Sequence, residues 1–265
     1  MVISPGKGDL SRYNMEGAFI MPQVIYGHRG ACGYAPENTL EAFELAAKQG
    51  AAGVELDVHL SKDGEVVVAH DETIDRVSNG SGYIRDMTVA ELKQYLFNKP
   101  HPEYKDARMP TLREVFELLK PYGLNVNVEL KNSVFFYPGM EKKCIELAAA
   151  VGMTDKVLYS SFNHYSLLKV KEIDPTIKCG LLYDCTMVRP WEYAKSLKMD
   201  ALHPRFHELQ IPDECSSAHA LGIEVNPWTV NNEKDLAMVI AAGADRIITN
   251  YPDRALAVMK SIKGA

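Results

Sequence analysis

The sequence predicts an α/β protein with the architecture of a (β/α)8 TIM barrel, in which eight parallel strands alternate with helices. From Leu112 onward the chain repeats one unit, a short apolar strand, a polar loop and an amphipathic helix. With two earlier strands the count reaches eight, and eight such units within 265 residues match the size of one closed barrel. A doubly wound open sheet is less favoured, because the first strand is not followed by a Gly-x-Gly-x-x-Gly turn.

The first strand–helix unit places two reactive side chains at a strand end. The apolar run from Val24 to Tyr26 stops before His28 and Arg29, where a buried strand would end. Asn38-Thr39 then begins an amphipathic helix that ends at Gly50. Because the reactive residues of a barrel lie at the carboxyl ends of its strands, His28 and Arg29 are candidates for the site.

The second strand, Gly53 to Leu60, carries polar side chains along one of its faces. Strict alternation puts Glu55, Asp57 and His59 on one face and aliphatic residues on the other. Two carboxylates side by side repel each other and are costly to desolvate, so a purely structural role is improbable. A divalent cation would remove this conflict.

The chain next departs from the strict alternation, and we expect a small insertion at about residues 61 to 109. It contains a β-rich run, Glu65 to Ala69, that delivers His70-Asp71. A capping box opens a helix from Thr88 to Leu96. The delayed barrel helix, Leu112 to Lys120, follows. The insertion is predicted to lie on the catalytic face, between the second strand and the second helix.

The remaining elements follow the same alternation. The predicted strands are Leu124 to Glu129, Val157 to Ser160, Lys178 to Leu182, Ala201 to His203, Ile223 to Thr229 and Arg246 to Thr249. The predicted helices are Met140 to Ala150, His164 to Ile173, Trp191 to Leu197, Pro212 to Leu221, Glu233 to Ala242 and Pro252 to Ile262.

The third barrel strand completes a candidate metal site. Alternation places Glu129 and Lys131 on one face near its carboxyl end, at the depth of Glu55 and Asp57. Three carboxylates make an oxygen-rich site for a hard cation such as Mg²⁺ or Ca²⁺. Glu55, Asp57 and Glu129 are therefore the predicted metal ligands.

Two histidines beside this cluster indicate acid–base chemistry on an anionic substrate. His28 and His70 are the predicted catalytic residues, with their roles as acid and base left open. Arg29 and Lys131 are predicted to bind phosphate, the alternatives being ion pairs with the neighbouring carboxylates. Trp228 is predicted to line the pocket and to pack against the apolar or cationic part of the substrate. The alternative is a position in the core.

Four ordered motifs give the chain a resemblance to a known family. His28-Arg29-Gly30, Pro36-Glu37-Asn38-Thr39, Glu55-Leu56-Asp57 and His70-Asp71 resemble the signature of the glycerophosphodiester phosphodiesterases. The Glu-x-Lys of the third barrel strand and the tryptophan at the seventh strand end are similar to that family as well. The resemblance implies an insertion after the second strand and metal-dependent hydrolysis of a glycerophosphodiester, a small molecule, to glycerol 3-phosphate and an alcohol.

Two other functions stay open at this stage. One is a lysophospholipase D-like enzyme of the same fold, which would need an exposed apolar groove for an acyl chain. The other is a catalytically silent barrel that binds phosphodiesters. The presence of both histidines and all three carboxylates speaks against the silent barrel.

Composition restricts partners and location. The chain, residues 1 to 265, is predicted to form one domain with a net charge of −6, which argues against nucleic acid and anionic membranes as partners. No apolar run reaches the roughly 18 residues of a transmembrane helix, so stable membrane insertion is not expected. The first 22 residues show no signal peptide, and five scattered cysteines form no Cys-x-x-Cys pair. We expect a reduced, cytoplasmic protein whose oligomeric state the sequence leaves open.

Overall fold

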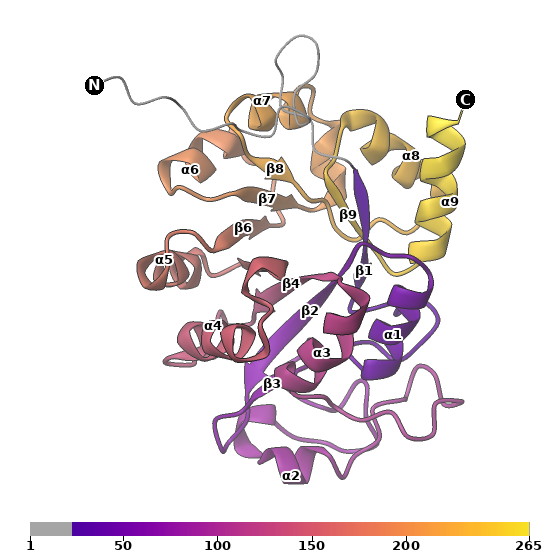
Figure 1. Ribbon diagram of the computed structural model, residues 1–265, viewed down its shortest axis with the longest axis vertical. Helices are drawn as coiled ribbons and strands as arrows, with labels where there is room; N and C mark the ends of the chain where they lie inside the picture. The colour runs from indigo at the N-terminus through magenta and orange to yellow at the C-terminus, as the bar shows by residue number, and fades with distance from the viewer. Residues whose placement is uncertain (1–22, 265) are drawn as a thin grey trace.

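Eight parallel strands form the predicted barrel (Figure 1). The computed structural model describes residues 23–264, so the first 22 residues and their predicted lack of a leader lie outside the described part. The strands follow the order β8-β7-β6-β5-β4-β2-β1-β9 around the barrel. Their bounds are β1 (Val24–His28), β2 (Gly53–Leu60), β4 (Asn125–Leu130), β5 (Val157–Ser161), β6 (Lys178–Tyr183), β7 (Ala201–Pro204), β8 (Glu224–Val225) and β9 (Arg246–Thr249).

Hydrogen bonds between the first and last strands of this order nearly close the barrel. The Asp245 N–H donates to the Val225 carbonyl at 2.8 Å, and the Ile248 N–H donates to the Pro227 carbonyl at 3.0 Å. The predicted strand at 223–229 is wrong in length, because the structure keeps only Glu224–Val225 as strand. Pro227 has no N–H to donate to a ladder, so regular pairing stops before it.

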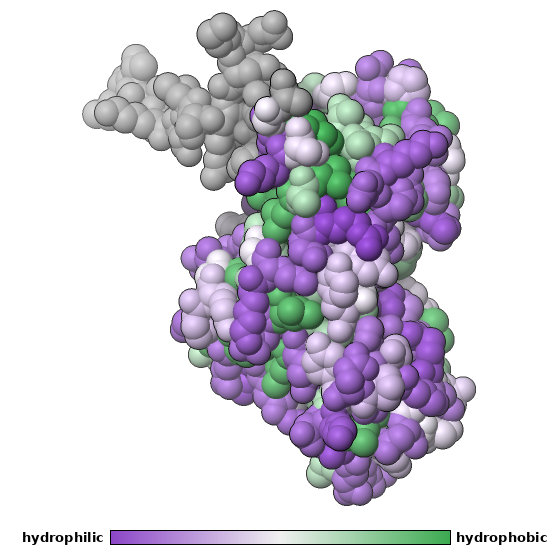
Figure 2. Space-filling model, turned by 90° about the vertical axis from the view of Figure 1, so that its right-hand side faces the viewer, coloured by the Kyte–Doolittle hydropathy of each residue, from purple (hydrophilic) through white to green (hydrophobic). Residues whose placement is uncertain are grey.

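A ring of helices surrounds the strands. Their bounds are α1 (Leu40–Lys48), α3 (Leu112–Leu119), α4 (Met140–Val151), α5 (His164–Ile173), α6 (Pro190–Ser196), α7 (Glu214–Ala220), α8 (Glu233–Ala242) and α9 (Pro252–Lys263), with short 3-10 turns η3 (Lys120–Tyr122), η4 (Thr154–Lys156) and η5 (Phe206–Gln210). Thr39 caps α1, and Thr111 with Glu114 forms a capping box on α3. The side of the molecule that carries α8, α9 and α1 presents mainly hydrophilic residues to solvent (Figure 2).

The segment after β2 forms the insertion. Strand β3 (Val66–Val68) pairs antiparallel with the end of β2, and η2 (Ile84–Asp86) and α2 (Val89–Leu92) follow it. The insertion has a small hydrophobic cluster of its own, built from Val67, Ala69, Ile74, Val77, Ile84, Leu92, Phe97 and Met109. The capping box at Thr88 is confirmed.

The predicted helix at 88–96 is too long, since α2 ends at Leu92. The backbone N–H of Leu96 donates to the side chain of Asn79 at 2.8 Å, and the Asn79 N–H donates to the Leu96 carbonyl at 3.0 Å. This exchange with a distant turn draws the chain away from a helical path.

Charged and aromatic side chains fill the amino end of the barrel. Arg246 on β9 donates to Glu224 on β8 at 2.7 Å and to the buried Tyr26 hydroxyl on β1 at 2.8 Å. These three side chains thus satisfy one another's hydrogen bonds at this end of the barrel. The opposite end, at the carboxyl ends of the strands, carries the polar site.

His219 on α7 gives the barrel closure a pH-dependent contribution to stability. Its Nε2 lies 2.8 Å from Asp245 Oδ2, which also accepts the Val225 N–H at 2.7 Å. The hydrogen bond to Asp245 outweighs partial burial and raises the pKa of His219. A raised folded-state pKa means that this contribution is complete below about pH 6.5 and is lost as the pH rises through the folded-state value.

We therefore expect His219→Gln to lower the free energy of unfolding by about 1 kcal/mol at about pH 6 and by less at about pH 8. Chemical denaturation of both proteins at the two pH values measures this difference. A difference that does not change with pH would show that the charge of the ring is not involved.

Candidate active site

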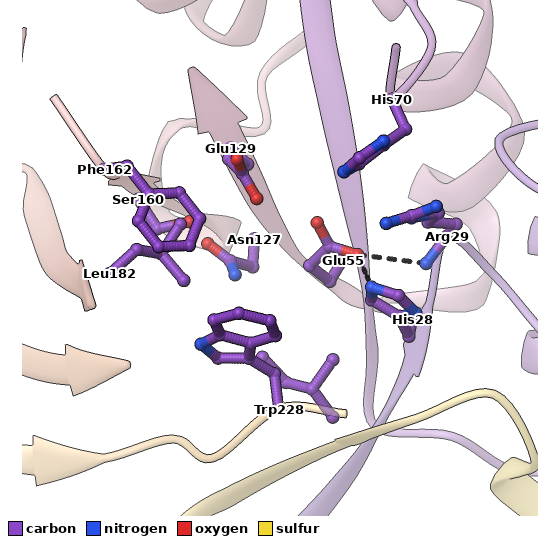
Figure 3. Close-up of a pocket in the computed structure, with 11 residues that line it drawn as sticks. His28, Arg29, Glu55, His70, Asn127, Glu129, Ser160, Phe162, Leu182 and Trp228 are labelled. Atoms are coloured by element: carbon purple, nitrogen blue, oxygen red, sulfur yellow. Dashed lines mark hydrogen bonds and ion pairs between the residues drawn. The ribbon is translucent and has the colours of Figure 1, made fainter. Parts of the chain in front are cut away.

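A cavity of about 220 Å³ opens at the carboxyl ends of the strands. Its lining contains six of the eight predicted site residues; the eleven lining residues are His28, Arg29, Glu55, His70, Asn127, Glu129, Ser160, Phe162, Leu182, Trp228 and Ile248. In Figure 3 the two histidines lie on one side, Trp228, Phe162 and Leu182 on the other, and the glutamates between them. The polar and apolar walls thus face each other across one small space.

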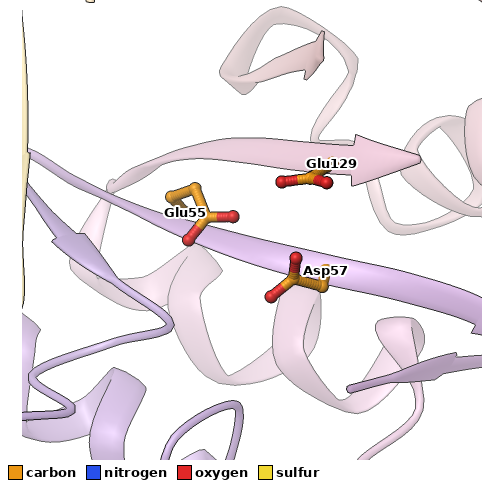
Figure 4. Close-up of side chains that lie close together, drawn as sticks. All are labelled: Glu55, Asp57 and Glu129. Carbon is orange, nitrogen blue, oxygen red and sulfur yellow. The ribbon is translucent and has the colours of Figure 1, made fainter. Parts of the chain in front are cut away.

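Three carboxylates converge beside this cavity (Figure 4). Glu55 and Asp57 come from β2 and Glu129 from β4, and the register of the two strands places Asp57 opposite Glu129. One oxygen of each lies within 4.8 Å of the others. All three side chains are buried. The structure therefore brings together the residues predicted as metal ligands.

The electrostatics of this acidic cluster indicate that positive charge is missing. Burial, and then the charge of Asp57, raises the pKa of Glu55 well above its usual value, and burial also raises the pKa of Glu129. Asp57 differs: despite burial, the charges of Arg29 and Lys131 lower its pKa. Asp57 Oδ1 has no hydrogen-bond donor among the described residues. A buried orphan oxygen within an all-oxygen donor set fits a hard cation.

A charge count of the connected network leads to the same conclusion. Ion pairs around the cavity join three cationic side chains to four carboxylates, namely Arg29, Arg76 and Lys131 with Glu37, Asp57, Asp71 and Glu129, and the backbone N–H of Arg29 donates to a fifth, Glu55. With every carboxylate ionised and both histidines neutral, this set would carry two negative charges. One divalent cation would neutralise them.

His28, at the end of β1, is fixed through one ring nitrogen. Its Nδ1 lies 2.7 Å from Asn250 Oδ1, and an amide oxygen only accepts, so Nδ1 carries the proton. Nε2 then carries the lone pair, 3.5 Å from the Thr229 hydroxyl and 3.9 Å from Glu55 Oε2, in a ring that lines the cavity. Burial and the charge of Arg29 lower the pKa of His28 to about 3. The ring is therefore neutral and able to accept a proton.

His70 follows β3 and is held by a carboxylate instead of an amide. Its Nδ1 donates to Asp71 Oδ1 at 2.6 Å, and its backbone carbonyl accepts from Nε2 of the buried His59 at 3.2 Å. The carboxylate of Asp71 thus fixes the orientation of the His70 ring, which lines the cavity. His59 is buried, contacts the Tyr137 hydroxyl at 3.3 Å and is not among the lining residues.

The two predicted phosphate-binding cations are paired with carboxylates. Arg29 lies 2.9 Å from Glu37 and 3.4 Å from Asp57, and it lines the cavity. Lys131 lies 2.9 Å from Glu129 and 3.7 Å from Asp57. Lys131 and Asp57 are not among the lining residues, so both lie behind the cavity wall.

Trp228 forms the apolar wall with Phe162. The indole Nε1–H donates to the His203 carbonyl at 2.8 Å, which fixes the ring plane. Phe162 meets it edge to face, with centroids 5.7 Å apart, and is 41% exposed at the cavity. Trp228, predicted at the end of the seventh strand, thus lines the pocket. His203 itself is buried and is not among the lining residues.

Sequence reasoning missed the partners of the site residues. Asn250 and Phe162 were visible only as strand ends, Asn127 only as one member of an alternating face, and Arg76 gave no signal.

Cys32 lies near Arg29, but burial raises the pKa of its thiol to about 12, which makes it a poor nucleophile.

The fold and the site define a class: a (β/α)8-barrel hydrolase that acts on phosphate esters. The comparisons with known proteins agree. Residues 28–254 match the model of the glycerophosphoryl diester phosphodiesterase family. A glycerophosphodiester phosphodiesterase of Caldanaerobacter subterraneus subsp. tengcongensis is 42% identical over 234 residues, which cover 88% of this chain and 96% of that protein. A glycerophosphodiester phosphodiesterase of Bacillus subtilis is 34% identical over 259 residues, which cover 90% of this chain and 87% of that protein.

Solved structures are similar over most of their length. An Oleispira antarctica phosphodiesterase in complex with the product sn-glycerol-3-phosphate superposes with a TM-score of 0.79 at 32% identity, covering 91% of this chain and 97% of that one. A glycerophosphodiester phosphodiesterase of Agrobacterium tumefaciens superposes with a TM-score of 0.77 at 27% identity, covering 89% of this chain and 99% of that one. The chain belongs to the glycerophosphodiester phosphodiesterase family, and its reaction is the hydrolysis of glycerophosphodiesters to glycerol 3-phosphate and an alcohol. Within residues 23–264, no helix is long and apolar enough to cross a membrane.

Proposed function

We propose that this enzyme hydrolyses its substrate with one divalent cation and two histidines of opposite roles, His28 as general base and His70 as general acid. The observation that carries this proposal is the arrangement of the cavity. Two imidazoles, each fixed through Nδ1 by a different kind of partner, flank the buried acidic cluster in one small space.

Glu55, Asp57 and Glu129 would hold the cation. Their donor set, their burial and the orphan Asp57 oxygen favour Mg²⁺ or Ca²⁺ over softer metals. When bound, a divalent cation supplies positive charge that withdraws electrons from a phosphate oxygen and activates a nearby hydroxyl.

His28 is suited to remove a proton from the attacking hydroxyl, which belongs to water or to the glycerol 2-position. Asn250 fixes its tautomer, so the lone pair of Nε2 faces the cavity. A neutral ring with a fixed lone pair is ready to accept a proton without reorienting.

His70 is suited to give a proton to the leaving alcohol oxygen. Its Nδ1–H donates to the Asp71 carboxylate at 2.6 Å, which holds the ring in place, and 34% of the side chain is exposed to solvent, which can return a proton after each turnover. Nδ1 of His28 thus contacts a neutral amide, whereas Nδ1 of His70 contacts a carboxylate. This difference is the basis for assigning the base to His28 and the acid to His70.

Arg29 and Lys131 would stabilise the phosphate oxygens. Arg29 reaches the cavity directly, whereas Lys131 stands behind Glu129 and acts at longer range. Because both cations are already held by carboxylates, little reorganisation is needed when charge redistributes in the transition state.

The size of the cavity favours a compact substrate over a lysophospholipid. A volume of 220 Å³ lies below the roughly 300 to 1,000 Å³ of sites that enclose drug-sized ligands, which suits a small glycerophosphodiester better than a substrate with an acyl chain. Trp228 and Phe162 would contact the alcohol portion through their ring faces, which also attract a quaternary ammonium group.

Removal and return of the metal tests the proposed cation. We expect chelator-stripped protein to release no glycerol 3-phosphate from glycerophosphocholine or glycerophosphoethanolamine, and Mg²⁺ or Ca²⁺ to restore the release. The same cation should raise the melting temperature, because binding to the folded state alone stabilises it. Full activity in the stripped protein, with no thermal shift on adding either ion, would overturn the cation proposal.

A cytoplasmic location and the absence of a nucleic-acid partner remain proposals as well. All five cysteines are free thiols in the described part of the chain, as expected in a reducing compartment. A net charge of −6 disfavours a polyanionic partner. Cell fractionation followed by immunodetection would test the location.

A further inference from the structure

Arg76 connects two site residues that the proposed mechanism uses separately. It lies in the insertion, between β3 and η2, and is not among the residues that line the cavity. Its Nε–H and Nη2–H donate to Asp71 at 2.7 and 3.1 Å. Its Nη1–H and Nη2–H donate to Glu37 at 2.7 Å each. The planar guanidinium therefore holds one carboxylate along each of two edges.

Each of these carboxylates holds a residue of the site. Asp71 accepts from Nδ1 of His70 at 2.6 Å, and Glu37 accepts from Nη1 of Arg29 at 2.9 Å. His70 and Arg29 both line the cavity. Arg76 is thus the common partner behind the proposed acid and the proposed phosphate-binding arginine.

We propose that Arg76 is a positioning residue that fixes Asp71 and Glu37, and through them His70 and Arg29, in the geometry that hydrolysis requires. The inference rests on the proposed function, in which His70 is the general acid. Arg76 does not itself bind phosphate, because four of its N–H donors are used by two carboxylates.

The charges explain why an arginine stands here. Glu37 and Asp71 bind the same guanidinium, and their negative charges repel each other unless a cation lies between them. Although burial acts in the opposite direction, the hydrogen bonds from Arg76 and His70 lower the pKa of Asp71 to about 2. Both carboxylates therefore stay ionised and oriented. A lysine would supply the charge, but its single ammonium cannot hold four oxygen contacts in a plane.

Steady-state kinetics of Arg76→Gln with two substrates test the proposal. Glycerophosphocholine has a leaving alcohol that needs a proton, whereas the 4-nitrophenyl ester of glycerol 3-phosphate releases a phenolate that needs none. We expect kcat on glycerophosphocholine to fall about 10- to 100-fold and kcat on the nitrophenyl ester to fall much less, because only the first depends on a correctly placed His70. KM should rise for both substrates, because both use Arg29.

Two further variants separate the two connections. Asp71→Asn should reproduce the loss that depends on the leaving group, and Glu37→Gln should reproduce the common rise in KM. Arg85→Gln is the matched control, since Arg85 lies in the same insertion, is equally exposed at 46%, and does not contact Asp71 or Glu37. It should leave both substrates unaffected.

The outcomes separate this inference from the proposed function. Unchanged kinetics in Arg76→Gln, or an equal loss of kcat on both substrates, overturns the positioning role. If His70→Ala itself shows no dependence on the leaving group, the proposed function fails. Melting temperatures show whether each variant is folded; if Arg76→Gln is not, Arg76→Lys takes its place with the same expected pattern.

Discussion

Replacement of His28 by Ala is expected to slow the hydrolysis of glycerophosphocholine by about 10²- to 10⁴-fold. The ring holds its Nε2 lone pair toward the cavity and is neutral because burial lowers its pKa to about 3. Its task is to take a proton from the nucleophile, and that step precedes departure of any leaving group. The same loss is therefore expected for the 4-nitrophenyl ester of glycerol 3-phosphate.

This equal loss distinguishes His28 from His70, whose replacement should spare the nitrophenyl ester. Initial rates with both substrates, at saturating cation, measure the difference. His207→Ala serves as the control, because His207 is exposed in η5 and is not among the lining residues. An active His28→Ala protein would contradict a catalytic role, and a loss confined to glycerophosphocholine would give His28 the role of acid.

Glu55→Gln is expected to separate activity from stability. Hydrolysis should fall about 10²- to 10³-fold, because the proposed cation loses one of three carboxylates. Without a cation, burial and the neighbouring charges raise the pKa of Glu55 well above normal, so its ionised form is disfavoured in the fold. An isosteric amide then changes little, and the free energy of unfolding in chelator should stay equal or rise.

Asp57→Asn is expected to differ from Glu55→Gln in its effect on stability. Asp57 pairs with Arg29 and Lys131, and these charges lower its pKa, so its ionised form stabilises the fold. Removing that charge should cost activity and also about 3 to 5 kcal/mol of stability. Chemical denaturation in chelator and calorimetric titration with Mg²⁺ or Ca²⁺ measure both effects. Equal destabilisation by the two variants would contradict the difference in charge state between Glu55 and Asp57.

Local patterns in the sequence were sufficient to predict the barrel and most of its strands. Alternation along β2 and β4 placed Glu55, Asp57 and Glu129 on interior faces, because the side-chain period of a strand is a property of the backbone alone. Strand ends located His28 in the same way. The parallel register then had to bring these side chains to one end of the barrel.

Element ends were less well predicted than the elements themselves. The helix at α2 stops early because Asn79 engages the backbone of Leu96, and β8 stops early at Pro227. The contact of Asn79 does not belong to the helical pattern of its segment, whereas Pro227 lies within the predicted strand and its missing N–H is readable from the sequence.

By itself, the sequence determined the fold, the family signature, the three carboxylates and the two histidines, because each follows from spacing along the chain. Only the tertiary structure decided how the two histidines differ. Asn250 stands 222 residues from His28, and Glu37 stands 39 residues from Arg76, so no local pattern connects either pair. His70 is held by the residue that follows it in the chain, whereas the partner of His28 depends on which loops meet at the rim of the barrel, and that is fixed only when the barrel closes.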